Sequence, residues 1–253
     1  MLDRNFFNRD TLRVAKELLG KIIVINKNDI TYRAMITETE AYLGINDRAA
    51  HTFAGRKTER NKIMYEDAGT IYVYQTYGIH YMLNFVTLDQ NQPEAVLIRS
   101  VDPIDGINQM SINRFEKTYE DLNNYQKKNL TNGPGKLTKA LDIDKSFNGK
   151  NLFTKDFYIT EGKNNFQIET DVRIGIDYAM EAIDYPYRFY IKDNPHVSKI
   201  KRWDYLISSF VFSLKPWLIS VSNILPLFLI TDPCFLGICV LNESDLRFES
   251  LKS

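Results

Sequence analysis

The sequence predicts a single α+β domain followed by a C-terminal tail of different composition. Three observations support this fold class: strand-like runs follow one another across short turns, helix-like segments are few, and 253 residues suffice for one large core. Hydrophobic residues make up 44% of the chain and charged residues 25%, which is ordinary globular composition. We expect the main domain to span residues 1–200 and a hydrophobic tail to span residues 201–253.

The chain begins with a predicted helix and two predicted strands. Asp10 is a suitable N-cap for an amphipathic helix that ends at Gly20. A β-branched run predicts a strand over residues 21–26, and the polar residues 27–29 turn the chain back. A second strand follows over residues 31–41.

A tyrosine-rich hairpin is predicted in the middle of the chain. Residues 70–76 and 79–88 form its two strands, joined at Tyr77-Gly78, and a further strand is expected over residues 95–101. The remaining predicted elements are helices over residues 105–126, 136–141 and 178–183, and short strands over residues 157–160, 172–175 and 188–191.

Two glutamates in the 31–41 strand are the first candidates for chemistry. Glu38 and Glu40 alternate with small residues, and the aromatic hairpin follows them. A carboxylate can draw a proton from water and flat rings can bind a flat substrate, which indicates an enzyme acting on a nucleobase. The alternative is structural: the glutamates would face solvent from a half-buried strand, and Tyr72 and Tyr74 would be core or cross-strand residues.

The balance of charge limits the kinds of nucleic-acid binding that are open to the protein. The 32 basic and 32 acidic residues argue against a strong non-specific binder, which would normally show a basic excess. A local patch could still hold DNA, or it could be a solvated loop. Its basic residues are Arg48, Arg56, Lys57, Arg60 and Lys62, opposed by Asp47 and Glu59.

Cysteine and histidine usage favours a protein without metal or cofactor. Cys234 and Cys239 are the only cysteines and both lie in the tail, which excludes a disulfide framework and a cysteine-based zinc site in the main domain. The three histidines are scattered along the chain. No secretory signal follows Met1, so we expect a cytoplasmic protein.

An ordered set of short segments along the chain is its most specific feature. These segments are residues 38–44, 49–51, 60–61, 69–74, 77–78 with Asn84, 95–99, 133–137, 173–176 and 188–190. Together they closely resemble the alkyladenine (3-methyladenine) DNA glycosylase family. The resemblance runs from about Phe6 to about Ser198, and its specificity comes from the order of the whole set rather than from any single segment.

The resemblance implies a fold and a reaction. The sheet is expected to be curved and mainly antiparallel, with flanking helices and a protruding hairpin. The expected enzyme is a monomer that flips damaged purines out of double-stranded DNA and hydrolyses the N-glycosidic bond. The lesions would be 3-methyladenine, other alkylpurines, and also hypoxanthine and etheno adducts. No lysine lies within residues 38–42 to act as an amine nucleophile, so we expect attack by water without lyase activity.

The resemblance also assigns roles within the pocket. Glu40 would activate the water and stabilise the cationic sugar, with Arg99 holding both. Tyr42 would stack on one face of the flipped base, and His51 with Tyr74 on the other.

Other matching residues would contact the duplex or select the base. Asn84 would crowd the exocyclic amine of normal guanine and so exclude it. Tyr77 would fill the gap left in the duplex. Arg56, Arg60 and Lys136 are the expected DNA-binding cations.

From the residues themselves, two other classes of function stay open. One is a nucleic-acid-binding module without hydrolysis, in which the aromatic hairpin grips bases and Glu40 is structural. The other is a nucleotide-acting hydrolase of unrelated fold.

The tail does not resemble the family. Residues 206–230 are about long enough to cross a bilayer, although Lys215, Pro216, Asn223 and Pro226 argue against a clean transmembrane helix. Three interpretations are open: an extension caused by a frameshift or read-through, a membrane anchor, or a soluble extension. Membrane contact is expected only if the tail is a genuine part of the protein.

Overall fold

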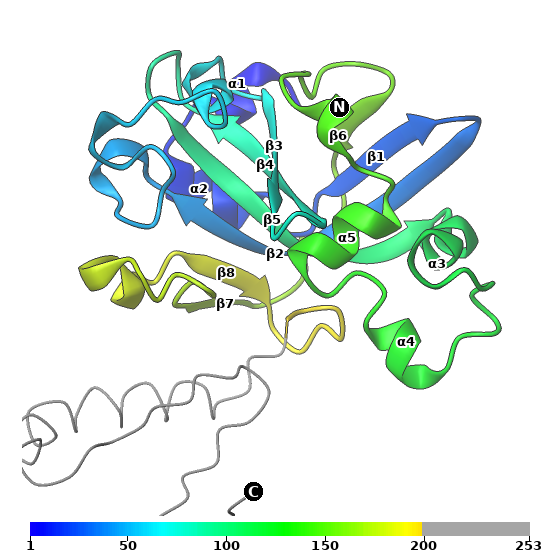
Figure 1. Cartoon of the computed structure of the whole chain (residues 1–253). Coiled ribbons are helices and arrows are strands. Elements are labelled where there is room, and N and C mark those ends of the chain that lie inside the picture. The colour runs from blue at the N-terminus through cyan, green and yellow to red at the C-terminus, as the bar shows by residue number, and fades with distance from the viewer. Residues whose placement is uncertain (199–253) are drawn as a thin grey trace, which may run out of the picture. The chain divides into compact units, whose positions relative to one another are not determined.

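The computed structural model describes residues 1–198 (Figure 1). Met1–Lys199 form one compact unit, and the predictions for the tail lie outside the described residues. Within residues 1–198, no helix combines the length and the apolar character needed to span a membrane.

One curled antiparallel sheet of eight strands forms the centre of the described unit, which confirms the predicted α+β class. Its main path runs β3-β4-β5-β2-β1-β6, while β8 pairs with both β2 and β7. The strands are β1 (Ile22–Lys27), β2 (Ile30–Tyr42), β3 (Ile71–Thr76), β4 (His80–Thr87), β5 (Glu94–Asp105), β6 (Phe157–Thr160), β7 (Ile168–Asp171) and β8 (Arg188–Ile191).

Strand β2 organises the sheet because its edge changes partner along its length. It pairs with β5 on one side, whereas on the other side its first half pairs with β1 and residues Glu38 to Glu40 pair with β8. The register with β5 shifts between Ile36 and Thr39, and such bulges bend a strand and strengthen its twist. The yellow β7–β8 pair therefore lies beside the end of β2 that carries the two glutamates (Figure 1).

Short helices flank the sheet. The Asp10 side chain accepts a hydrogen bond from the Arg13 amide and so caps α2 as predicted, and Pro134 begins α5, which packs against β4 and β5. The α-helices are α1 (Arg4–Phe7), α2 (Thr11–Glu17), α3 (Ile107–Phe115), α4 (Asn124–Lys128) and α5 (Pro134–Ala140). Single 3₁₀ turns span Gly44–Asn46, Phe53–Gly55, Lys62–Tyr65, Lys145–Phe147 and Met180–Asp184.

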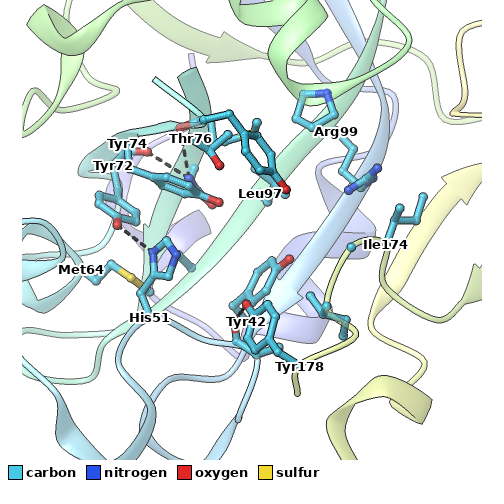
Figure 2. A pocket seen from close by; sticks show the side chains of 18 residues that line it. Tyr42, His51, Met64, Tyr72, Tyr74, Thr76, Leu97, Arg99, Ile174 and Tyr178 are labelled. Atoms are coloured by element: carbon cyan, nitrogen blue, oxygen red, sulfur yellow. Dashed lines mark hydrogen bonds between the residues drawn. The ribbon is translucent and has the colours of Figure 1, made fainter. Parts of the chain in front are cut away.

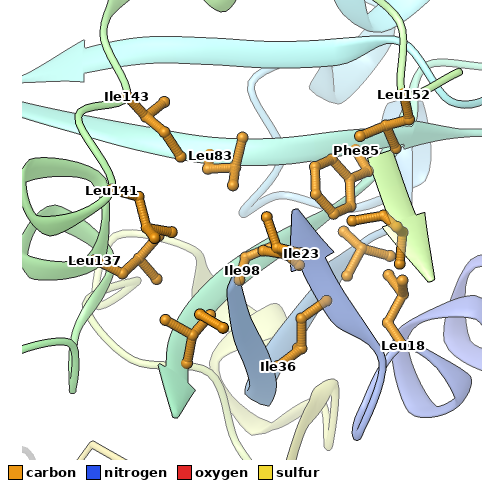
Figure 3. Packing of buried hydrophobic residues seen from close by; sticks show 14 of the residues in the cluster. Leu18, Ile23, Ile36, Leu83, Phe85, Ile98, Leu137, Leu141, Ile143 and Leu152 are labelled. Carbon is orange, nitrogen blue, oxygen red and sulfur yellow. The ribbon is translucent and has the colours of Figure 1, made fainter. Parts of the chain in front are cut away.

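The hydrophobic core lies between the sheet and these helices (Figure 3). Leu18, from the end of α2, meets Ile23 and Ile36 of the sheet, and Phe85 and Ile98 extend the same cluster across β4 and β5. All five side chains are fully buried, and each contributes about 1.5–3 kcal/mol by leaving water. This packing fixes the strand that carries the candidate carboxylate.

Two predicted elements are wrong. The helix expected over residues 105–126 is the short α3, because Glu116 adopts a left-handed backbone with φ of 59° and the polar residues after it offer no continuous apolar stripe. A separate helix, α4, begins at Asn124 instead. The strand expected over residues 172–175 is a loop, because the Ile174 amide donates to the Glu40 carboxylate rather than to a neighbouring strand.

The predicted hairpin is formed by β3 and β4. Tyr77 and Gly78 at its tip both have left-handed backbones, with φ of 51° and 70°. This conformation costs a bulky L-residue about 1–2 kcal/mol, and the Tyr77 side chain is 90% exposed. The ring gains almost nothing from burial at a strained position, which indicates a role outside the fold.

Candidate active site

A cavity of about 270 Å³ opens between the β3–β4 hairpin, the end of β2 and the loop after β7 (Figure 2). Arg99 and Ile174 lie on one side of it, and His51, Tyr72 and Tyr74 lie on the other. The aromatic side chains that line it are Tyr42, His51, Tyr72, Tyr74, Tyr77 and Tyr178. A concave pocket lined by apolar and aromatic side chains with a few polar groups is the usual form of a small-molecule site.

Glu40 lies directly behind the wall of this cavity and is fully buried. Its Oε1 accepts from the Ile174 amide at 2.8 Å and lies 3.1 Å from Nη1 of Arg99. Its Oε2 accepts from the Tyr42 hydroxyl at 2.8 Å. Since Tyr42, Arg99 and Ile174 all line the cavity, every partner of the carboxylate is also part of the pocket wall.

The Tyr42 hydroxyl stays protonated beside this carboxylate. Burial, with the negative charge of Glu40 as the next contribution, raises the pKa of Tyr42 well above its ordinary value of 10. The hydroxyl is therefore a hydrogen-bond donor at neutral pH and fixes one oxygen of Glu40.

Glu38 is buried as completely as Glu40, so the interpretation of the two glutamates as a solvent-facing row is wrong. Arginines from two other strands explain this burial: Nε of Arg99 donates to Glu38 at 3.1 Å and Nε of Arg188 at 2.6 Å. Burial raises the pKa of Glu38, but the charges of Arg99 and Arg188 outweigh it, and the pKa lies below its ordinary value.

Aromatic side chains form two opposing walls of the cavity. The His51 and Tyr74 rings meet edge to face with their centroids 4.6 Å apart, and Nδ1 of His51 lies 3.0 Å from the Tyr72 hydroxyl. Tyr42 lies across the cavity, with the Arg173 guanidinium 4.8 Å from its ring centroid. The structure therefore brings together Tyr42, His51 and Tyr74, as predicted from the sequence.

Asn84 also lines the cavity, from β4. Its Nδ2 donates to the carbonyl oxygens of Tyr72 and Met82 at 3.2 and 3.3 Å, and its side chain is almost fully buried. These two backbone groups fix the position of the amide in the cavity wall.

The basic loop beside the cavity is only partly available to a phosphate. Arg56 and Arg60 are exposed, and Arg60 lies over the Tyr74 ring with its guanidinium carbon 5.1 Å from the centroid. Arg48 pairs with Glu181, and Lys62 with Glu59.

Lys136 lies apart from this loop, at the start of α5. Its ammonium donates to the side-chain oxygens of Asn129 and Asn132 at 2.8 Å each. Burial and the nearby Arg114 lower the pKa of Lys136.

Several groups that shape the site were not identified from the sequence. Asp47, expected to oppose the basic patch, is buried against Arg173 instead. The Ile174 amide holds Glu40, and the Asn61 side chain ties the 51–61 loop by donating to the carbonyls of His51 and Arg56. The matching segments at 60–61 and 173–176 contain Asn61 and Ile174, whereas Asp47 lies outside every matching segment. Hydrogen bonds from a backbone amide, or from one side chain to distant carbonyls, leave no sequence pattern of their own.

Protonation of His51 should destabilise the protein in mild acid. Burial lowers the pKa of His51 to about 4, and the charges of Arg60 and Arg56 act in the same direction. The unfolded chain, with a pKa near 6.5, takes up the proton first, so stability present above pH 6.5 is lost as the pH falls towards about 4. The shift converts to at most about 3 kcal/mol, and screening of the half-buried ring reduces this to about 1–2 kcal/mol.

The comparison of wild type with His51→Gln isolates this effect. We expect the free energy of unfolding, measured by urea titration and circular dichroism, to fall more for wild type than for the variant between neutral pH and about pH 5. Parallel pH dependence of the two proteins would contradict the assignment.

A buried carboxylate behind a cavity with many aromatic side chains is an arrangement suited to hydrolysis at a flat base. A sequence model of methylpurine-DNA glycosylase matches residues 5–195. The chain belongs to this family and is therefore a DNA glycosylase that hydrolyses N-glycosidic bonds. The predicted family is confirmed, and the choice between an enzyme and a binding module is answered in favour of the enzyme.

Bacterial relatives carry the provisional name 3-methyladenine DNA glycosylase. One from Clostridium novyi (strain NT) is 54% identical over 198 residues, covering 78% of this chain and 98% of that protein. Others from Clostridium perfringens (strain 13 / Type A) and Desulfitobacterium hafniense (strain Y51) are 49% and 50% identical, each again covering 78% of this chain and 98% of the relative.

Proposed function

We propose that the protein removes 3-methyladenine and other alkylpurines, as well as hypoxanthine and etheno adducts, from double-stranded DNA. The reaction is hydrolysis of the N-glycosidic bond of a nucleotide flipped into the cavity. The observation that carries this proposal is the Glu40 carboxylate, held by three groups that all line the pocket. The names of the relatives support 3-methyladenine as a substrate.

Stacking offsets the cost of flipping. Taking a base out of the duplex costs a few kcal/mol, and each aromatic contact with a base contributes about 1–3 kcal/mol. Tyr42 on one side and the His51–Tyr74 pair on the other offer two such contacts. His51 is neutral at physiological pH, since burial lowers its pKa to about 4, and so adds no charge that would repel a cationic alkylpurine.

Glu40 supplies the chemistry in this proposal. Departure of the base leaves a cationic, oxocarbenium-like sugar, which a nearby carboxylate stabilises. The same carboxylate takes a proton from the water that attacks C1′, and the hydroxyl oxygen forms the new bond to the sugar. Arg99 and the Ile174 amide hold Oε1, which leaves Oε2, bonded once to Tyr42, with capacity to accept from the water.

The reaction stops at an abasic site. Among the described residues that line the cavity there is no lysine to attack C1′ and form a Schiff base, which supports a monofunctional enzyme. Asn84, fixed by two backbone carbonyls, would clash with the exocyclic amine of guanine and so exclude the normal base.

Tyr77 and the exposed arginines contact the duplex in this proposal. The strained, 90% exposed Tyr77 fills the space of the flipped nucleotide, while Arg56 and Arg60 bind phosphates. Lys136 joins them only where its ammonium exchanges Asn129 and Asn132 for a phosphate.

The Tyr77 role predicts a difference between DNA forms. We expect Tyr77→Ala to slow excision from a duplex while sparing excision of the same lesion from a single strand, which has no stack to fill. Single-turnover rates on the two forms measure this, and an equal loss on both would contradict a wedge.

We propose that residues 1–200 form the glycosylase domain, acting as a monomer in the cytoplasm, where bacterial DNA lies. The alignments include 98% of each relative but only 78% of this chain. This difference supports a domain boundary near residue 200. Deletion of residues 203–253 should then leave excision intact, and loss of activity on deletion would show that the tail contributes.

Release of bases by the full-length protein tests the function directly. Duplexes carrying one hypoxanthine or one ethenoadenine are incubated with enzyme and treated with alkali, and methylated DNA is assayed for free 3-methyladenine. We expect alkali-dependent breaks and released base. Breaks without alkali, or a covalent adduct trapped by borohydride, would contradict the monofunctional mechanism, and no base release from any substrate would contradict the function.

A further inference from the structure

Glu38 occupies a position that hydrolysis itself does not use. It is fully buried on β2, two residues before Glu40, and it does not line the cavity. Its Oε1 accepts from Nε of Arg99 at 3.1 Å and from Nε of Arg188 at 2.6 Å, and its Oε2 accepts from the Ser198 amide at 2.8 Å. Burying a carboxylate together with charged donors carries a large desolvation penalty. This penalty makes it reasonable to look for a functional role of the arrangement.

Arg99 is shared between the two glutamates of β2. Its Nε bonds to Glu38 while its Nη1 contacts Oε1 of Glu40 at 3.1 Å. The guanidinium is planar, so two carboxylates bound through different nitrogens fix both its position and its rotation. Without Glu38, the arginine could turn to face Glu40 with two nitrogens and neutralise the carboxylate that must accept a proton.

Glu38 is itself held from the C-terminal end of the described unit. Arg188 donates to Glu38 through Nε, pairs with Asp171 at 3.2 Å, and donates through Nη2 to the Ser198 carbonyl at 3.4 Å. The Ser198 peptide thus meets both members of the Glu38–Arg188 pair. Among the described residues, Oγ of Ser198 has no hydrogen-bond partner, so its polar contribution comes from the backbone.

We infer that Glu38 is a positioning residue: it holds Arg99 against Glu40. The backbone amide of Ser198 in turn holds the Glu38 carboxylate. This inference rests on the proposed roles of Glu40 and Arg99. It makes the segment just before residue 199 part of the catalytic arrangement, although it lies outside the cavity.

A pair of substitutions at Ser198 separates the amide from the side chain. Ser198→Pro removes the N–H donor to Glu38, whereas Ser198→Ala keeps it and removes only the hydroxyl. In the full-length protein we expect single-turnover excision of hypoxanthine by Ser198→Pro to be at least roughly tenfold slower than by Ser198→Ala, because misplacement by a fraction of an ångström lowers the rate strongly. Equal rates for the two variants would overturn the role of the amide.

Glu38→Gln tests the positioning role without depending on the fold of the C-terminal segment. We expect the maximal excision rate to fall roughly 10–100-fold, with lesion-duplex binding retained. The acidic limb of the rate–pH profile should move to lower pH, because Arg99 would then face Glu40 alone. Glu38→Asp, which keeps the charge but shortens the reach, should recover part of the rate. Loss of stability by itself would not move the pH profile.

Failure of this inference can be told apart from failure of the proposed function. If wild type releases base and Glu40→Gln does not, but Glu38→Gln keeps the wild-type rate and pH profile, the positioning role is overturned and the function stands. If wild type releases no base, the proposed function fails and the inference fails with it.

Discussion

Glu40→Gln should abolish base excision while leaving the protein folded and able to bind a lesion. Positioned base catalysis contributes about 10²–10⁴-fold. Because the substitution also removes the charge that stabilises the cationic sugar, the excision rate should fall by a factor at the upper end of that range or larger. Single-turnover excision from a hypoxanthine duplex measures the rate, and fluorescence anisotropy of the same duplex measures binding.

The contacts of Glu40 explain why the variant should fold. Glutamine has nearly the same shape, and its Oε1 can still accept from the Ile174 amide and from Arg99. Its Nε2 replaces the oxygen that accepts from Tyr42, and the tyrosine hydroxyl can rotate to accept instead. Lost rate at retained binding would therefore report on chemistry.

The exposed Glu120 provides a matched control for this substitution. Glu120→Gln makes the same change of charge on the loop after α3, outside the cavity, and should excise at the wild-type rate. Excision by Glu40→Gln at that same rate would show that another group activates the water.

The fold was predictable where sequence patterns are local. The cap at Asp10, strand β2 and the β3–β4 hairpin follow from capping, alternation and turn residues within a few positions of one another. The helix expected over residues 105–126 failed because its apolar stripe stops near Phe115, and the left-handed backbone of Glu116 ends it.

The site was predictable to a lesser extent. The resemblance identified Glu40, Tyr42 and Arg99, which the structure brings together, but it gave no reason to place Glu38 in the interior. Contacts that join distant segments leave no local signal. Arg173 and its partner Asp47 are separated by 126 residues, and only the folded structure shows that they meet.

Breaking this Arg173–Asp47 pair should destabilise the protein more than any surface substitution. Both side chains are buried, Nη2 of Arg173 donates to Asp47 at 2.8 Å, and Nη1 bonds to the same carboxylate. Asp47 also accepts from the amides of Leu43 and Ala49, and Arg173 donates to the Ala41 carbonyl at 2.9 Å. The pair thus joins the end of β2 to the loop that carries Ile174.

Asp47→Asn would leave the Arg173 charge buried without a carboxylate, at a cost of about 3–5 kcal/mol. For a domain of this size, each kcal/mol lowers the melting temperature by about 2–4 °C. Thermal unfolding followed by circular dichroism measures the loss. Excision should weaken too, because the Ile174 amide that holds Glu40 follows Arg173 directly in the chain.

A surface pair and a double variant show whether burial causes this loss. Arg48 and Glu181 lie 2.8 Å apart but have exposed side chains, so Glu181→Gln should cost no more than about 1 kcal/mol. Adding Arg173→Met to Asp47→Asn removes the unpaired charge, so the double variant should lose less stability than the sum of the two single variants. If the stability losses of the two single variants were additive, the role of burial would be contradicted. The same holds if Asp47→Asn lost as little stability as Glu181→Gln.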